Sequence, residues 1–153
     1  MEHVPIHRLH GIPTDLVIEA ARRGENPTGS CRMASGWAVL GDWQLLPGYC
    51  VLLADPQVPD LNSLGTEARD SFLRDITRVG DAILQITDAE RINYSIFGNS
   101  DPILHAHICP RYAWEEPSLR KGPTAHYDRS KGPSFDLERG AGMMRQIRDA
   151  IHQ

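Results

Sequence analysis

The 153 residues of this chain suit one domain of ordinary size, and a hydrophobic share of 41% is enough for a globular core. Twenty acidic and sixteen basic residues give a net charge of −4, which argues against a nucleic-acid polymer or an anionic membrane as partner. Three cysteines without CxxC spacing predict neither a disulfide framework nor a zinc knuckle. The first residues, MEHVPIHRLH, lack the pattern of a secretory leader, and no apolar run is long enough to span a membrane. We therefore expect a single cytoplasmic domain over residues 1–153.

The first part of the chain predicts a short helix followed by three strands. Residues 12–27, IPTDLVIEAARRGENP, carry a helix-start signal at Thr14 and a stop at Gly24. In residues 31–56 the apolar runs are separated by the turn-forming pairs SG, GD and PG. This pattern predicts three short antiparallel strands joined by turns.

The second part predicts a long helix, a hairpin and a final helix. Residues 66–87 begin with Thr66, a residue type that caps helices, and repeat apolar side chains at helical spacing. RINYSIFG (91–98) and ILHAHICP (103–110) predict two paired strands. Residues 116–134 are rich in Pro, Gly, Ser and charge and predict a long loop, whereas 135–153 predict a helix. The fold class is α+β: an antiparallel sheet of about five strands, a long helix packed on it, and additional terminal helices.

The second strand of the predicted hairpin carries two histidines. In an extended chain His105 and His107 lie on one face together with Ile103 and Cys109, because side chains alternate between faces. Such a pair can be hydrogen-bonded core residues, zinc ligands, or a nucleophile with a phosphate contact. A zinc site would use His105, His107 and Cys109 with a fourth ligand from Cys31, Cys50 or His126. Asn99 and Ser100 before the strand and Arg111 after it favour a phosphate.

The stretch GNSDPILHAHICPR resembles the histidine-triad superfamily, whose pattern is a Gly-Gln-Ser/Thr loop followed by His-x-His-x-His, two apolar residues and Pro-Arg. Alignment on Pro110-Arg111 places His107 at the third histidine and His105 at the middle one. LLPGYCVLLADP resembles the family's strand after a Pro-Gly-His turn, and DLNSLGTEARDSFLRDI resembles its long helix. The resemblance covers about residues 35–114, which we expect to be the core of the domain.

The resemblance implies a hydrolase or nucleotidyl transferase acting on the α-phosphate of a nucleoside phosphoramidate, a dinucleoside polyphosphate or a similar conjugate. By analogy with the family, His105 attacks the phosphorus to form a nucleotidyl-histidine, and His107 contacts a non-bridging oxygen. Asn99 and Ser100 would donate hydrogen bonds to the phosphate, with Arg111 nearby, and Asp42 would bind the ribose. The resemblance also implies a homodimer and a small nucleotide as the partner. We expect no metal or other cofactor, because structural zinc usually takes close ligand pairs from two separate segments.

Two positions depart from the family pattern. Ile103 stands at the first histidine of the triad, and Tyr49 stands where the turn usually carries a histidine. We expect Tyr49 and Ile103 to contact each other behind His105, and a backbone carbonyl to orient that imidazole in their place. The alternatives are a nucleotide-binding module without turnover and, with less support, a zinc protein. The cations of the 116–134 loop are interpreted as solvated: Arg120, Lys121, Arg129 and Lys131.

Overall fold

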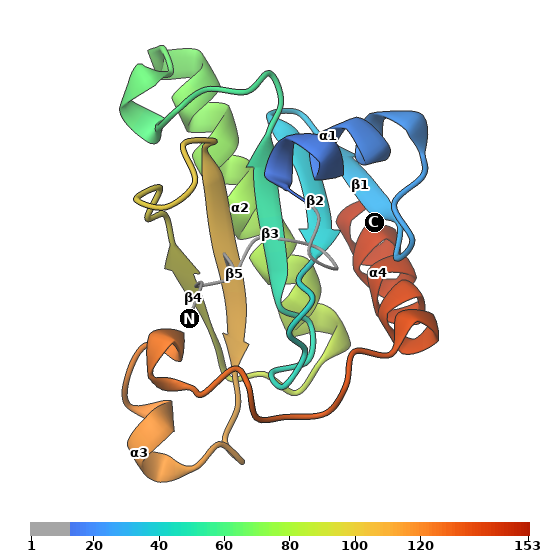
Figure 1. Ribbon diagram of the computed structural model, residues 1–153, viewed down its shortest axis with the longest axis vertical. Helices are drawn as coiled ribbons and strands as arrows, with labels where there is room; N and C mark the ends of the chain where they lie inside the picture. The colour runs from blue at the N-terminus through green and yellow to red at the C-terminus, as the bar shows by residue number, and fades with distance from the viewer. Residues whose placement is uncertain (1–12) are drawn as a thin grey trace.

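The computed structural model describes residues 13–153 and contains five strands and four α-helices in this part of the chain. The elements are α1 (Thr14–Arg23), β1 (Ser30–Met33), β2 (Gly36–Leu40), β3 (Cys50–Ala54), α2 (Thr66–Ile86), β4 (Arg91–Ser95), β5 (His105–Arg111), α3 (Pro117–Arg120) and α4 (Leu137–Ile151). The strands form one antiparallel sheet in the order β1-β2-β3-β5-β4 (Figure 1). The α+β class and the sheet of about five strands are confirmed.

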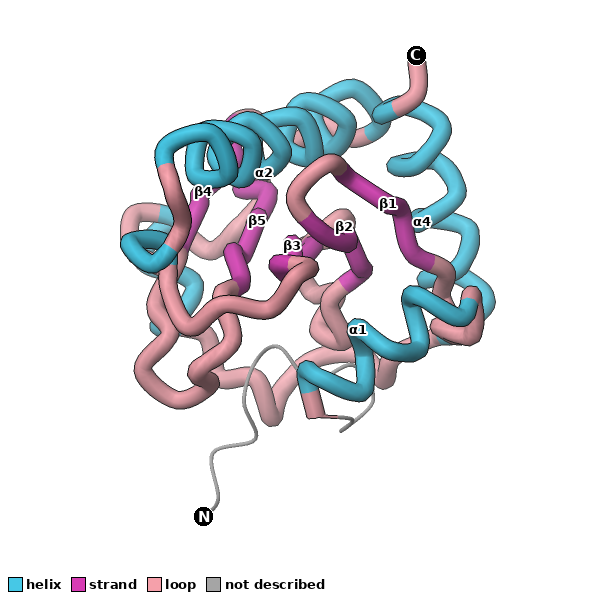
Figure 2. The backbone as a smooth tube through the Cα atoms, turned by 90° about the horizontal axis from the view of Figure 1, so that it is seen from above, coloured by secondary structure: helices cyan, strands magenta, loops and turns pink. Residues whose placement is uncertain are grey.

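The two faces of the sheet bury different apolar clusters. Figure 2 shows α2 and α4 on one side of the sheet and α1 on the other. The predicted stripe of α2 is buried against the first side, and it consists of Phe72, Ile76, Val79 and Ile83. Val17 and Ile18 of α1 pack on the second side with Tyr49 and Cys109. The periodicity of the long helix therefore identified its buried face correctly.

The strand β5 lies between β3 and β4, so both of its edges are hydrogen-bonded. In the register with β3, Leu53 is opposite His105 and Val51 is opposite His107. Leu104, Ala106 and Ile108 point to the cluster beneath α2, whereas His105 and His107 lie on the α1 side. The two histidines are thus held on an internal strand of the sheet.

Several boundaries differ from the sequence-based expectations. Thr66 is the first residue of α2, and Gly65 occupies the cap position, so the Thr66 side chain does not cap the helix. The strand β5 begins at His105, because Asp101 accepts a hydrogen bond from the backbone N–H of Ile103 and holds the preceding residues in a turn. Within the predicted loop, residues 117–120 form α3, which begins where the Glu116 side chain accepts hydrogen bonds from backbone N–H groups.

Residues 1–12, on which the expectation of no secretory leader rests, lie outside the described residues. Among the helices of residues 13–153, none has both the length and the apolar composition needed to cross a bilayer.

Candidate active site

His105 and His107 lie side by side on β5. Their ring centroids are 5.0 Å apart and the rings are nearly perpendicular, at 83°. The exposed fractions of the two residues are 3% and 7%, so each ring is largely enclosed by protein. The prediction that the alternation of β5 places both imidazoles on one face is confirmed.

The backbone of Ile103 orients the imidazole of His105. The Nδ1 atom of His105 lies 2.6 Å from the carbonyl oxygen of Ile103. A carbonyl oxygen only accepts hydrogen bonds, so Nδ1 carries the proton and the lone pair of the neutral ring is on Nε2. Ile103 therefore orients His105 through its main chain; the sequence had indicated a backbone carbonyl for this role without identifying its residue.

The turn that presents this carbonyl is anchored to helix α1. Asp101, 9% exposed, accepts a hydrogen bond of 3.1 Å from the Ile103 N–H and one of 2.5 Å from the Thr14 hydroxyl. Thr14 is the first residue of α1. Helix α1 thus anchors the turn whose Ile103 carbonyl orients His105.

Tyr49 contacts His107, whereas its expected contact with Ile103 behind His105 stays a prediction. The Tyr49 hydroxyl lies 2.5 Å from Nδ1 of His107, and the two rings are parallel within 5° at a centroid distance of 6.0 Å. In the β3–β5 register Cys50 is opposite Ile108, which sets Tyr49 beside Cys109. Ile103 precedes β5, and its partly buried side chain packs against the apolar cluster to which Tyr49 belongs.

Aromatic rings and one cation surround the Tyr49 side chain. Trp43 makes an edge contact with Tyr49 at 6.3 Å and another with Tyr127 at 5.4 Å. The guanidinium of Arg129 lies over Trp43 at 4.4 Å and over Tyr49 at 5.6 Å. The segment between α3 and α4, residues 121–136, therefore packs one of its cations against Trp43 and Tyr49, although the sequence had favoured a solvated role for all of them.

Arg111, predicted to bind the substrate, has a structural role instead. Its side chain is 6% exposed and pairs with Glu115, whose side chain is fully buried. It also donates to Asn93 and to the backbone carbonyls of residues 119, 120 and 122. Because a guanidinium has five N–H groups and these partners engage all of them, we reassign Arg111 from phosphate contact to scaffold.

Asn99 and Ser100 lie in the connection between β4 and β5, at the end of β5 that carries His105 (Figure 1). Both residues are exposed, and within residues 13–153 no hydrogen bond joins their side chains to the histidines. Phe97, in the same connection, is 63% exposed, and its ring centroid lies 6.2 Å from that of His107. Sequence reasoning missed Phe97, since an aromatic residue at the end of a strand is usually a packing residue.

Asp42 lies in the turn after β2, as predicted, and is half-buried. Burial raises its pKa to about 6, and the nearby Arg129 guanidinium opposes that rise only in part. Asp42 therefore lies near Tyr49 and Arg129.

The raised pKa of Asp42 predicts a specific dependence of stability on pH. A carboxyl whose pKa is higher in the folded state binds protons more tightly when folded, so it lowers stability as pH rises from about 4 to 6. Asp42→Asn should therefore increase the free energy of unfolding at pH 7.5 on the order of 2 kcal/mol, and most of that difference should vanish at pH 4. Urea denaturation at both pH values measures this, with the exposed Asp81→Asn as control. Equal effects of Asp42→Asn at the two pH values would contradict the prediction.

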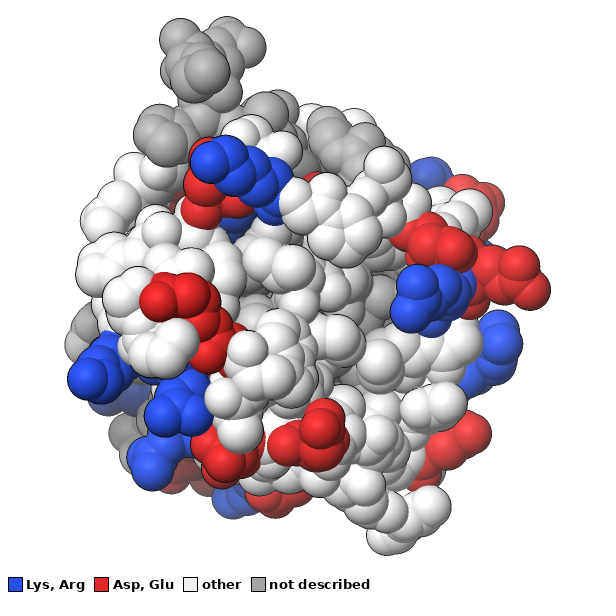
Figure 3. Space-filling model, turned by 90° about the horizontal axis from the view of Figure 1, so that it is seen from below, with Lys and Arg blue, Asp and Glu red and all other residues white. Residues whose placement is uncertain are grey.

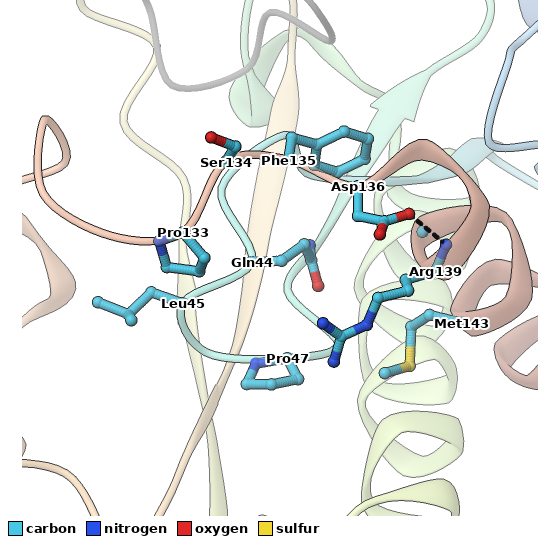
Figure 4. A pocket seen from close by; sticks show the side chains of 10 residues that line it. Gln44, Leu45, Pro47, Pro133, Ser134, Phe135, Asp136, Arg139 and Met143 are labelled. Carbon is cyan, nitrogen blue, oxygen red and sulfur yellow. Dashed lines mark hydrogen bonds between the residues drawn. The ribbon is translucent and has the colours of Figure 1, made fainter.

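A separate surface pocket of about 330 Å³ lies between the turn before β3 and the start of α4 (Figure 4). Leu45 and Pro47 form one wall, and Phe135, Arg139 and Met143 form the other. It contains none of the residues that the sequence assigned to the site. On the face of the molecule shown in Figure 3, acidic and basic side chains are interspersed and form no continuous basic patch.

The zinc hypothesis finds no support among residues 13–153, where no group of three or more His, Cys, Asp or Glu residues is placed to hold a metal ion. Cys109 is 3% exposed, and burial raises the pKa of its thiol to about 12. Zinc binds the thiolate, which is disfavoured in these surroundings.

Comparisons with known proteins agree with this architecture. No protein-family model matches the sequence, and no curated protein matches it. A histidine triad protein from Sinorhizobium meliloti matches with a TM-score of 0.68 at 17% identity, over 86% of this chain and 93% of that one. A histidine triad protein from Bradyrhizobium japonicum matches with a TM-score of 0.64 at 20% identity, over 79% and 87% of the two chains. A hypothetical histidine triad nucleotide-binding protein from Sulfolobus tokodaii gives 0.61 at 15% identity, over 79% and 80%.

Proposed function

We propose that this chain, which has the histidine-triad fold, is a nucleotide hydrolase or nucleotidyl transferase. Its substrates would be nucleoside phosphoramidates, dinucleoside polyphosphates or similar conjugates, and His105 would be the nucleophile. The observation that carries the proposal is the hydrogen bond from His105 Nδ1 to the carbonyl of Ile103, which leaves the lone pair of the neutral ring on Nε2.

The proposed reaction has two displacements at the same phosphorus. In the first, Nε2 of His105 forms a bond to the α-phosphorus while the bond from phosphorus to the leaving oxygen or nitrogen breaks, and the leaving group takes the electron pair, an amine also taking a proton from solvent. In the second, water or another acceptor attacks the phosphorus and releases a proton to solvent, while the bond to His105 breaks and its electron pair returns to Nε2, which restores the neutral imidazole. Each step requires mainly positioning and stabilisation of charge on the phosphate oxygens.

Other residues around the pair suit parts of a nucleotide. His107 lies beside the nucleophile and would contact a non-bridging phosphate oxygen. The exposed ring of Phe97 offers an apolar face to a base. Asn99 and Ser100, exposed at the His105 end of β5, would donate to the phosphate, and Asp42 would accept from a ribose hydroxyl.

The second candidate is a nucleotide-binding module without turnover. It is favoured by Ile103, whose side chain brings no ionisable group to the first triad position. The two candidates share the binding site and differ in whether the phosphorus bond is broken.

Binding and turnover should be measured on the same protein. We expect the wild type to bind adenosine monophosphate in calorimetric titrations and to release it from adenosine phosphoramidate or diadenosine polyphosphates. Phe97→Ala should raise the Kd about fivefold or more, because stacking on an aromatic ring contributes roughly 1–3 kcal/mol per base. Leu84→Ala, an exposed apolar side chain on α2, is the control and should leave the Kd unchanged. Binding without turnover would select the second candidate, and no binding would remove both.

A further inference from the structure

We propose that Tyr49 is a positioning residue that holds His107 in the opposite neutral tautomer to His105. The inference rests on the proposed function, in which His105 attacks the phosphorus and His107 donates a hydrogen bond to a phosphate oxygen. It assigns a role to the tyrosine that stands at a position where the family pattern has histidine.

The first step concerns the proton of the Tyr49 hydroxyl. Tyr49 is 1% exposed, and burial raises the pKa of its phenol well above the ordinary value, so the hydroxyl keeps its proton at neutral pH. A buried hydroxyl hydrogen requires an acceptor. Nδ1 of His107, at 2.5 Å, is placed to be that acceptor.

The second step concerns the direction of this hydrogen bond. The guanidinium of Arg129 lies over the Tyr49 ring at 5.6 Å, and because a guanidinium only donates hydrogen bonds it cannot accept the phenol hydrogen. Nδ1 of His107 lies within hydrogen-bond distance of the hydroxyl, so the hydroxyl directs its hydrogen to that nitrogen. With Nδ1 of His107 as acceptor, the proton of the neutral imidazole is on Nε2.

The third step compares the two histidines. His105 donates from Nδ1 to a carbonyl, so its Nε2 carries the lone pair that a nucleophile needs. His107 accepts at Nδ1 from Tyr49, so its Nε2 carries a hydrogen that can be donated to a phosphate oxygen. Two identical side chains on one strand face are thereby given different chemical tasks by their different partners.

The tautomers can be read directly from the ¹⁵N chemical shifts of the two imidazoles in the substrate-free protein at a pH where both are neutral. We expect the wild type to show His105 protonated at Nδ1 and His107 protonated at Nε2. Tyr49→Phe, which removes only the hydroxyl, should convert His107 to a mixture of tautomers and leave His105 unchanged. Tyr112→Phe is the matched control, because Tyr112 is also buried but donates its hydroxyl to the carbonyl of Pro47.

The kinetic expectation separates positioning from general damage. For Tyr49→Phe, kcat should fall about tenfold to a hundredfold, less than the loss expected when a whole transition-state donor is removed, and KM should change by less than about threefold. Tyr112→Phe should retain both constants. Wild-type His107 protonated at Nδ1, or an unchanged kcat in Tyr49→Phe, would overturn the proposal. If the wild type has no turnover, the proposed function fails, and the ¹⁵N measurement still decides the tautomer of His107.

Discussion

Incubation with adenosine phosphoramidate or a dinucleoside polyphosphate should leave a mononucleotide covalently attached to His105. The adduct contains a phosphorus–nitrogen bond, so it should be labile in acid and stable in alkali. Mass spectrometry after a rapid quench should locate the added mass on the peptide that contains His105. His105→Asn should abolish the adduct and lower turnover roughly 10⁴-fold, because asparagine has no nucleophilic nitrogen.

The binding of nucleotide should largely survive this substitution. The asparagine amide can still donate to the carbonyl of Ile103, and the other contacts to the nucleotide remain. We therefore expect the Kd to stay within about tenfold of the wild-type value, equivalent to ~1.4 kcal/mol. His126 is an exposed histidine between α3 and α4, and His126→Asn is therefore the control, which should form the adduct on His105 as the wild type does. An adduct that persists in His105→Asn would show that another residue is the nucleophile.

Arg111→Met should destabilise the fold by about 3–5 kcal/mol, because it leaves the buried carboxylate of Glu115 without its cation. The Glu115 side chain is fully buried, and Tyr127 and the backbone N–H of Tyr112 are its other hydrogen-bond donors. Chemical denaturation at pH 7 measures the loss. Lys131→Met removes an exposed ion pair to Asp128 and should cost less than about 1 kcal/mol.

The stability that Arg111→Met loses at pH 7 should become smaller as the pH falls, and chemical denaturation at low pH measures this change. Burial alone would raise the pKa of Glu115, but hydrogen bonds from Arg111 and Tyr127 hold it below its ordinary value of 4.5. The pair therefore stabilises the fold above that pH and loses its contribution as the pH falls through the folded-state pKa.

The double variant Arg111→Met/Glu115→Gln should lose less stability than the sum of the two single changes. Additive losses would mean that the two side chains act independently.

The helices and strands of this fold were predictable where the spacing of apolar residues in the sequence matches the face that the element buries. The apolar spacing of α2 and the alternation of β5 each identify a buried face from the sequence alone, and both predictions are confirmed. A backbone carbonyl as the group that orients His105 could be anticipated because every residue has one, whereas its assignment to Ile103 comes from the structure.

The misplaced residues are those whose partners come from distant segments. Arg111 follows the histidines on the same face of β5, but the carbonyls that accept its hydrogen bonds belong to residues 119 and 122, in the segment after the strand. The contact of Tyr49 with His107 was not predicted, because sequence alignment does not specify the register of β3 against β5; the observed register sets Tyr49 beside Cys109, and its side chain reaches His107. Arg129 reaches Trp43 only because the loop returns to the sheet, and no local pattern indicates that return.

Arg111 donates hydrogen bonds to the backbone carbonyls of residues 119, 120 and 122, and these bonds divide the segment after β5 into two parts that we expect to evolve at different rates. Residues 111–122 are tied together by the guanidinium, so substitutions or insertions there would disturb the end of the histidine strand. Residues 123–136 are mostly exposed and accept no hydrogen bond from Arg111, although Tyr127 donates to Glu115, and they include Arg129 over the Tyr49 ring. Changes in this second part can alter the preferred leaving group while the strand that performs the chemistry stays unaltered. Diversification among descendants of this chain should therefore concentrate after residue 122.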